Sequence, residues 1–343
     1  MYDYWRGGTN DYAADRRKAD EIERWYPAVR QMVTDNSAFA GRAVTWTARE
    51  GISCYLEMGS RLSAAGGIHG TARAAHRQPA AVWVAYVDRD PEVIEETERI
   101  LDKDGREGVA VVWADLRAPA AVLGEQGLKD VIEPGEPVCV ILTLVLHFMP
   151  PCQARELVAG YVRELRPGSL VVIGVPRNDD SRSFREVRAA WPDGDLYNHT
   201  RQEIAGFFGD LEMIPPGLVV ARGWRGGMPA ANVPPDGRLY VLGGVGRKLI
   251  TSSGTNDVQG AALRSTRTWA AAISASYRAR TASPERLSGW SGTLTISSAP
   301  DALCPATIAG SRPKVANKWD RVTRYCRPRR RTGQGKVPTA AIS

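Results

Sequence analysis

Residues 54–70 read CYLEMGSRLSAAGGIHG and give the clearest indication of the fold. It begins as a short apolar strand, meets the acidic Glu57 near its end, and breaks into glycine at Gly59, Gly66 and Gly67 before a helical pattern starts. A strand that runs through a glycine-rich turn into a helix is typical of the first βα unit of a nucleotide-binding sheet. The stretch therefore predicts an α/β fold that binds a ligand at the carboxyl end of this strand.

The same unit repeats further along the chain. Apolar runs predict strands at residues 54–58, 82–87, 109–113, 138–146 and 170–175. Helical patterns alternate with them, at 91–101 after a proline start and at 152–166 before a Pro-Gly stop. The fourth run is apolar almost throughout, as a central parallel strand covered on both faces must be. The alternation predicts a three-layer, mostly parallel sheet.

Helices are also predicted before the first strand. Residues 1–10, MYDYWRGGTN, show no period and predict a loop or arm, whereas 11–25 show amphipathic helical spacing. A further helix is predicted to be capped by Asp35 or Asn36 and to run to Arg49.

The closing strands of the body are predicted to differ from the first five. Thr200 and Glu203 form a capping box that starts a helix. The β-like runs at 218–221 and 238–242 follow with no helix between them. Adjacent strands without a crossover helix pair antiparallel, so the final strand should be antiparallel.

The positive charge of the chain is confined to its end. The whole chain carries 45 Lys and Arg against 38 Asp and Glu, but residues 251–343 hold 15 and 4 of these. Residues 1–250 are therefore net acidic, and a nucleic-acid partner is not expected for them. The tail is rich in Ser, Thr, Ala and Arg with weak periodicity, and we expect it to be disordered.

Cysteine spacing and hydropathy indicate the compartment. The five cysteines form no C-x-x-C pair, which fits a reducing cytoplasm. The longest apolar run, at 138–149, is too short to span a bilayer. The sequence shows no metal-ligand cluster, P-loop or G-x-S-x-G elbow.

Two acids follow predicted strands, where open α/β sheets bind ligands. Asp88 can accept hydrogen bonds from the vicinal hydroxyls of a ribose, or it can cap the next helix, although Asp90 suits a cap better. Asp115 can accept from an exocyclic amine such as adenine N6 while Leu116 flanks the ring, or it can be a solvated loop aspartate. A cofactor that contains a nucleoside would use both acids.

His147 is the candidate catalytic residue. It ends the fourth predicted strand, where general bases are common, and a structural histidine is the alternative. His69 and His76 fall in the first predicted crossover helix and are interpreted as helix-surface residues.

Several motifs together resemble one family. They are YDYWRGGTNDYAADR at 2–16, EMGSRLSAAGGIH at 57–69, YVDRDP at 86–91, ADLR at 114–117, LHF at 146–148 and GGVGRK at 243–248. Their order and spacing resemble a bacterial family of stand-alone S-adenosylmethionine-dependent methyltransferases. The resemblance covers about residues 1–248. That family's first turn normally reads Asp-x-Gly-x-Gly, where this chain has Glu57 and Arg61.

The resemblance implies a class I, Rossmann-like methyltransferase sheet with S-adenosylmethionine as cofactor. It implies cofactor contacts at Glu57, Gly59 and Ser60 for the methionine part, Asp88 for the ribose, Asp115 and Leu116 for the adenine, and Tyr2, Gly7 and Gly8 folding over the ligand. Trp5, Asn10, Asn36 and Phe148 are placed on the substrate side. We expect a small-molecule acceptor.

The predicted organisation is an N-terminal helical segment at 1–50, a methyltransferase body at 51–250 and a basic tail at 251–343. Two alternatives remain at this point. A nicotinamide-dependent oxidoreductase would use a similar sheet, but the glycine fingerprint is incomplete and the acid at Asp88 comes later than usual. The second alternative is a regulatory protein that binds the cofactor without catalysing a reaction.

Overall fold

The computed structural model describes residues 1–7, 13–59, 67–104, 107–129, 135–179, 181–191, 195–226 and 239–249. The predicted tail at 251–343 lies outside the described residues. So do Gly8, Asn10, Ser60 and Arg61.

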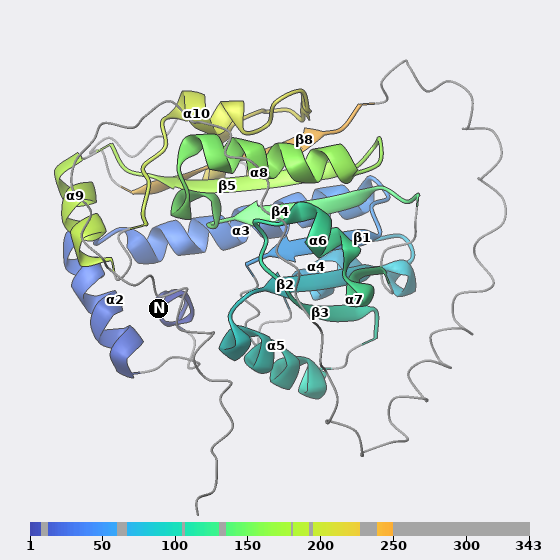
Figure 1. The fold of residues 1–343 in the computed structure, drawn as a ribbon, viewed down its shortest axis with the longest axis horizontal. Helices are drawn as coiled ribbons and strands as arrows, with labels where there is room; N and C mark the ends of the chain where they lie inside the picture. The colour runs from blue at the N-terminus through green and yellow to red at the C-terminus, as the bar shows by residue number, and fades with distance from the viewer. Residues whose placement is uncertain are drawn as a thin grey trace, which may run out of the picture.

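One eight-stranded sheet forms the centre of the protein (Figure 1). Its strands are β1 (Cys54–Met58), β2 (Trp83–Asp88), β3 (Val109–Trp113), β4 (Val138–Thr143), β5 (Leu170–Arg177), β6 (Glu212–Met213), β7 (Val219–Val220) and β8 (Tyr240–Arg247). Their order is β3-β2-β1-β4-β5-β8-β6, and β7 also pairs with β8. Strands β1 to β5 are parallel, whereas β8 runs antiparallel to β5, β6 and β7. The predicted mixed sheet is confirmed.

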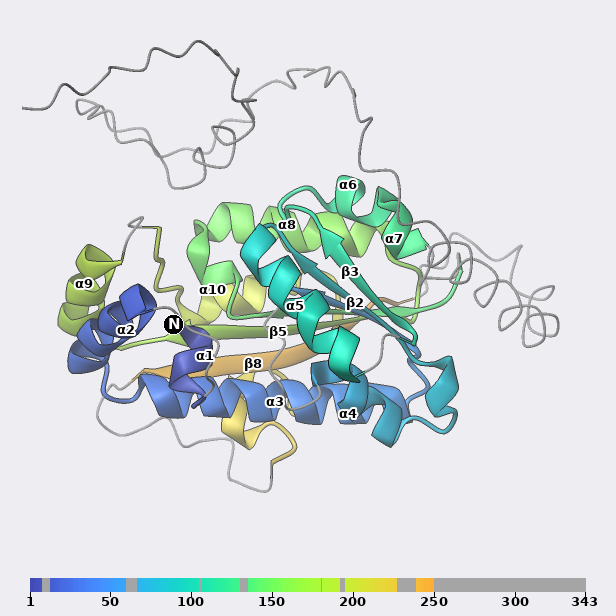
Figure 2. The same cartoon turned by 90° about the horizontal axis from the view of Figure 1, so that it is seen from below.

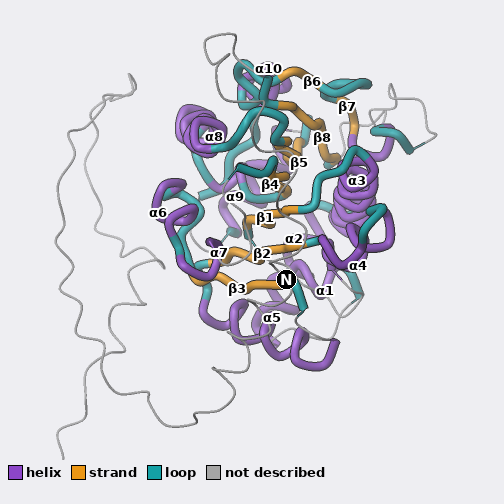
Figure 3. The backbone as a smooth tube through the Cα atoms, turned by 90° about the vertical axis from the view of Figure 1, so that its right-hand side faces the viewer, coloured by secondary structure: helices purple, strands orange, loops and turns teal. Residues whose placement is uncertain are grey.

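Helices cover both faces of this sheet. They are α1 (Tyr2–Trp5), α2 (Ala13–Trp25), α3 (Val29–Arg49), α4 (Gly67–Ala75), α5 (Pro91–Asp104), α6 (Pro119–Gly124), α7 (Gln126–Lys129), α8 (Pro151–Glu164), α9 (Ser181–Ala190) and α10 (Arg201–Gly206), with 3-10 turns η1 (Pro79–Ala81), η2 (Leu146–Phe148) and η3 (Ala221–Gly223). Figures 2 and 3 show α3 and α4 on one face and α6 and α8 on the other. At one end of the sheet, α9 lies beside α2 (Figures 1 and 2).

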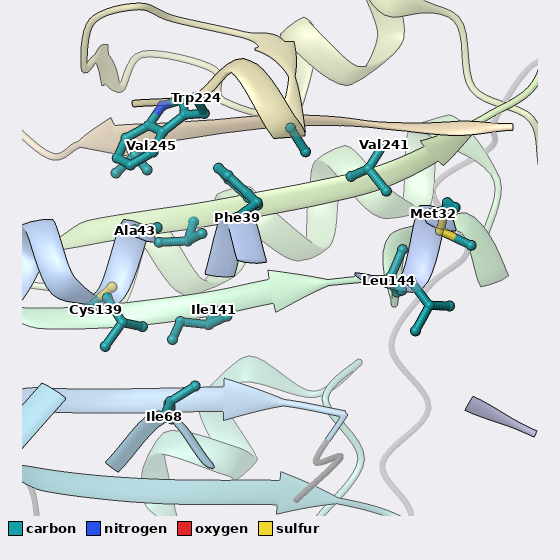
Figure 4. Close-up of a cluster of buried hydrophobic side chains, with 14 of the residues drawn as sticks. Met32, Phe39, Ala43, Ile68, Cys139, Ile141, Leu144, Trp224, Val241 and Val245 are labelled. Carbon is teal, nitrogen blue, oxygen red and sulfur yellow. The ribbon is translucent and has the colours of Figure 1, made fainter. Parts of the chain in front are cut away.

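The apolar core lies on both sides of the central strands. All six residues of β4 are buried, as the continuous apolar run predicts. On the α3 face, Phe39 lies against β8 so closely that a Cβ atom at Gly243 would be 2.8 Å from the ring (Figure 4). Trp224 meets Phe39 edge to face, with 5.7 Å between the ring centroids. The long helix α3 is thereby fixed across the sheet before any site residue is placed.

Helix α3 corrects one prediction. It is continuous from Val29 to Arg49, so neither Asp35 nor Asn36 caps a helix. Both side chains face other parts of the fold instead. Asp35 forms an ion pair with Arg222 at 2.6 Å, and the Oδ1 atom of Asn36 would lie 2.8 Å from a Cβ atom at Gly174 on β5. Packing against the sheet, and not a local capping residue, determines where this helix begins.

Other boundaries also differ from the predictions. The fourth strand ends at Thr143 rather than Leu146, because Leu144 has a positive φ of 54° and the chain then turns into η2. The arm at 1–10 contains one helical turn, α1. The capping box at Thr200 is confirmed, since its side chain and Glu203 exchange hydrogen bonds with each other's backbone N–H. Across the described segments, we find no helix with the length and apolarity needed to cross a bilayer.

Candidate functional site

The carboxyl ends of β1, β2 and β3 meet at one edge of the sheet. The backbone N–H of Gly59 donates to the carbonyl of Val87 at 2.9 Å, and the N–H of Ala114 donates to the carbonyl of Asp88 at 2.9 Å. These bonds extend the parallel ladders past the strands and align the segments that follow. The structure therefore brings Glu57, Gly59, Asp88 and Asp115 together along this edge.

Gly59 is a glycine for two independent reasons. Its φ of +77° lies in the left-handed region, which a side chain disfavours. A Cβ atom there would also lie 2.5 Å from Cγ1 of Val145, so no side chain has room. The first turn consequently lies directly against the segment that follows β4.

Asp88 and Asp90 differ in what their carboxylates bind, since one of them caps α5 and the other remains a candidate ribose acceptor. An Oδ1 atom of Asp90 accepts from the N–H of Glu92 at 3.0 Å, so Asp90 caps α5. Oδ1 of Asp88 accepts from the N–H of Asp90 at 2.9 Å, which orients the half-buried carboxylate at the end of β2. A carboxylate has further acceptor positions beyond one such bond, so this geometry fits a ribose diol.

Asp115 lies in a cationic setting. Arg117 Nε is 3.0 Å from both of its carboxylate oxygens, and Arg89 Nη1 is 3.5 Å from one. Burial works to raise the pKa of Asp115, but the hydrogen bonds and charge of Arg117, with the charge of Arg89, outweigh it and hold the pKa below its usual value. The residue stays an ionised acceptor, as recognition of an amine requires. The alternative prediction, a loop aspartate surrounded by water, did not include the contacts with Arg89 and Arg117.

Leu116 is fixed beside Asp115. Its carbonyl accepts from the Tyr161 hydroxyl of α8 at 2.8 Å, and its half-buried side chain packs against the α8-side core. An apolar side chain beside an ionised acceptor suits an adenine ring with its exocyclic amine. The edge from Gly59 to Leu116 thus fits S-adenosylmethionine, the cofactor that the resemblance implies.

His69 corrects another prediction. It is only 7% exposed and is not a helix-surface residue. Its Nδ1 atom lies 2.7 Å from the Tyr86 hydroxyl, and its backbone N–H donates to that hydroxyl at 3.3 Å. The bond ties the start of α4, just after the glycine-rich turn, to β2. His76 lies one residue beyond the end of α4.

A second feature lies past the ends of β4 and β5. A partly open cavity of about 70 Å³ lies between α1, α2, α3, α9 and the loop at 195–199. His147 and Trp5 both line it, and so does Asn178 from the segment after β5. The lining also includes residues that the sequence analysis missed: Tyr26, Met32, Phe184, Trp191, Tyr197 and Asn198. Aromatic residues spread over several segments carry no sequence motif, which is why they were missed.

The other predicted site residues that the structure describes do not line this cavity. Phe148 is half-buried and packs against His147, with 4.0 Å between the ring centroids and 37° between the ring planes. The Tyr2 hydroxyl lies 3.3 Å from Ser37 Oγ on α3. Gly7 is exposed with φ at +79°. Asn36 is buried against β5, away from the cavity lining.

Comparisons with known proteins agree with this geometry. A model of the S-adenosyl methyltransferase family matches residues 1–249. The chain is similar to a crystal structure of a Thermobifida fusca YX protein to which methyltransferase activity is ascribed, with 28% identity and a TM-score of 0.63 over 73% of this chain and 93% of that one. It is similar to a DUF574 family protein from Streptomyces avermitilis MA-4680, with 28% identity and a TM-score of 0.64 over 72% and 95%.

A search of curated proteins finds no match. The family match decides between the two cofactors considered and excludes the nicotinamide interpretation. The chain belongs to the S-adenosyl methyltransferase family and is an S-adenosylmethionine-dependent methyltransferase.

Proposed function

We propose that the protein methylates a small molecule bound in the cavity beneath α1. The observation that carries this proposal is the continuity between the cofactor edge and the cavity. Gly59 is in close contact with Val145, and His147, two residues further on, lines the cavity. An acceptor in the cavity would therefore lie next to the first turn.

The residues of the chain would act mainly by binding and orienting. S-adenosylmethionine, when bound, supplies an electrophilic methyl group on a sulfonium. Glu57, Gly59 and Ser60 would hold its methionine part, Asp88 its ribose, and Asp115 with Leu116 its adenine. Fixing two reactants in alignment is itself a large contribution to rate.

His147 would remove the proton from an acceptor hydroxyl or amine. It reaches the cavity from η2, and the Tyr197 N–H donates to its carbonyl at 2.8 Å, which fixes its backbone. Trp5 would close the cavity from above and exclude water, with Tyr2, Gly7 and Gly8 carrying the α1 segment over the ligands. Tyr2 already contacts α3 in this position.

Methyl transfer from labelled S-adenosylmethionine to a panel of small acceptors tests this proposal. His147→Asn should lower turnover by about 10²–10⁴ while cofactor affinity, measured by calorimetry, stays the same. His76→Asn, outside the cavity, is the control and should keep full turnover. If His147→Asn lowers the melting temperature but leaves the activity of the folded fraction intact, His147 is structural and the proposed role is wrong.

A further inference from the structure

We infer that the acceptor is a neutral aromatic molecule with a hydrogen-bond acceptor atom that receives the Trp5 indole N–H. The inference rests on the proposed function, because it names the substrate class of the same cavity.

The charge of the cavity lining limits which ligands can bind there. No Asp, Glu, Lys or Arg side chain is among the described residues that line the cavity. Moving an unpaired carboxylate, phosphate or ammonium group out of water into such surroundings costs several kcal/mol. The buried part of the acceptor must therefore be neutral. This separates the cavity from the nearby cofactor edge, where Asp88, Arg89, Asp115 and Arg117 carry charge.

The shape of the lining comes next. Five aromatic rings line the cavity from different segments: Trp5, Tyr26, Phe184, Trp191 and Tyr197. Rings prefer offset-stacked and edge-to-face contacts with other rings, so a planar ligand gains most from these walls. A volume of about 70 Å³ is several times what one water molecule requires, yet small for a polymer segment. A planar group therefore matches these walls.

The Trp5 indole supplies the polar contact. Trp5 is 8% exposed, and its Nε1 atom has no hydrogen-bond partner among the described residues. An indole N–H can only donate, and an unmet buried donor is unfavourable. The Asn198 side chain is engaged, since it bonds the backbone N–H and carbonyl of Asn178 at 3.1 and 2.6 Å. A ligand oxygen near Trp5 would satisfy the indole donor.

Two matched probes test charge. 4-Hydroxyacetophenone and 4-hydroxybenzoate differ only in a neutral methyl ketone against a carboxylate of similar size. We expect calorimetry on the full chain with S-adenosylhomocysteine present to show at least tenfold tighter binding of the ketone. Equal or tighter binding of the carboxylate would overturn the inference. This comparison needs no variant.

Trp5→Phe tests the donor, because it removes the N–H and keeps a ring. The variant should lose about three- to tenfold in affinity for 4-hydroxyacetophenone. Its affinity for toluene, which has no acceptor atom, should not change. Trp25→Phe is the control, because Trp25 is exposed and lies outside the cavity lining, and it should leave both affinities unchanged. If Trp5→Phe keeps both its melting temperature and its affinity for the ketone, the Trp5 indole N–H does not bind the ligand.

The outcomes separate this inference from the proposed function. If an anionic or cationic small acceptor is methylated and loses turnover in His147→Asn, the proposed function stands and the substrate class is wrong. A different outcome would be that neither probe competes with a methylated acceptor, and that Trp5→Phe and His147→Asn leave the turnover of that acceptor unchanged. The cavity would then not be the acceptor site, and both the proposed function and this inference would be wrong.

Discussion

The Nε2 atom of His199 lies 3.1 Å from the carbonyl oxygen of Leu146. A carbonyl can only accept, so Nε2 must carry the hydrogen. This bond joins the loop before α10 to η2, the turn that presents His147 to the cavity. Burial lowers the pKa of His199, against smaller raising effects from the Leu146 bond and the Glu203 charge, so the folded protein holds this imidazole neutral.

The pH dependence of stability should follow from this histidine. Its pKa is lower in the folded state than in the unfolded state, where it is about 6.5. Above that pH the imidazole is neutral in both states. As the pH falls below it, the unfolded state binds a proton that the folded state does not, so stability should be lost. We expect the melting temperature to drop between pH 7.5 and 5.5, and to drop less in His199→Gln. Equal slopes in both proteins would show that other groups cause the loss.

Removing the Tyr86 hydroxyl should loosen the first turn. Burial, with the nearby charge of Glu57, raises the pKa of Tyr86 above the physiological range, so the hydroxyl stays protonated and keeps its hydrogen bond with His69 Nδ1. Tyr86→Phe should cost about 1–3 kcal/mol in urea unfolding, because buried partners lose a bond. It should also weaken S-adenosylmethionine binding.

Tyr55→Phe is the matched control. Tyr55 is equally buried, and its hydroxyl donates to the Ile52 carbonyl at 3.0 Å, at the opposite end of β1 from the turn. This variant should lose stability without losing cofactor affinity. A similar loss of affinity in both variants would mean that destabilisation alone causes it.

Asp88→Ala should weaken S-adenosylmethionine binding by about 1.5–3 kcal/mol, the range for a hydrogen bond to a charged group. Asp90→Ala, two residues on, removes the α5 cap instead. It should cost about 1 kcal/mol of stability and leave affinity nearly unchanged. Calorimetry on both proteins checks the pair. The ribose assignment fails if Asp90→Ala weakens binding as much as Asp88→Ala.

Cutting the chain after Ile250 should leave the body folded. Strand β8 ends at Arg247, and the family match ends at residue 249. The composition of 251–343 offers little periodic apolar surface to offset chain entropy. The shortened protein should keep its melting temperature and cofactor affinity, measured beside the full chain. A large loss of stability would show that the tail packs on the body.

Local patterns in the sequence were enough to predict the sheet and the edge where the carboxyl ends of β1, β2 and β3 meet. Apolar strands, glycine turns and acids at strand ends are local patterns, and parallel pairing necessarily brings their carboxyl ends to one edge. For that reason β1 and β3 were predicted with their observed bounds, and Gly59, Asp88 and Asp115 were predicted as neighbours. The capping box at Thr200 is equally local.

The remaining features depend on how distant segments pack together. His69 becomes a buried partner of Tyr86, and Asn36 lies against β5, because α3 and α4 pack on the sheet at angles that helical spacing does not specify. The cavity is lined from segments as distant as Trp5 and Leu239. A surface built from many segments leaves no pattern in any one of them, since each aromatic residue alone is typical of a core position.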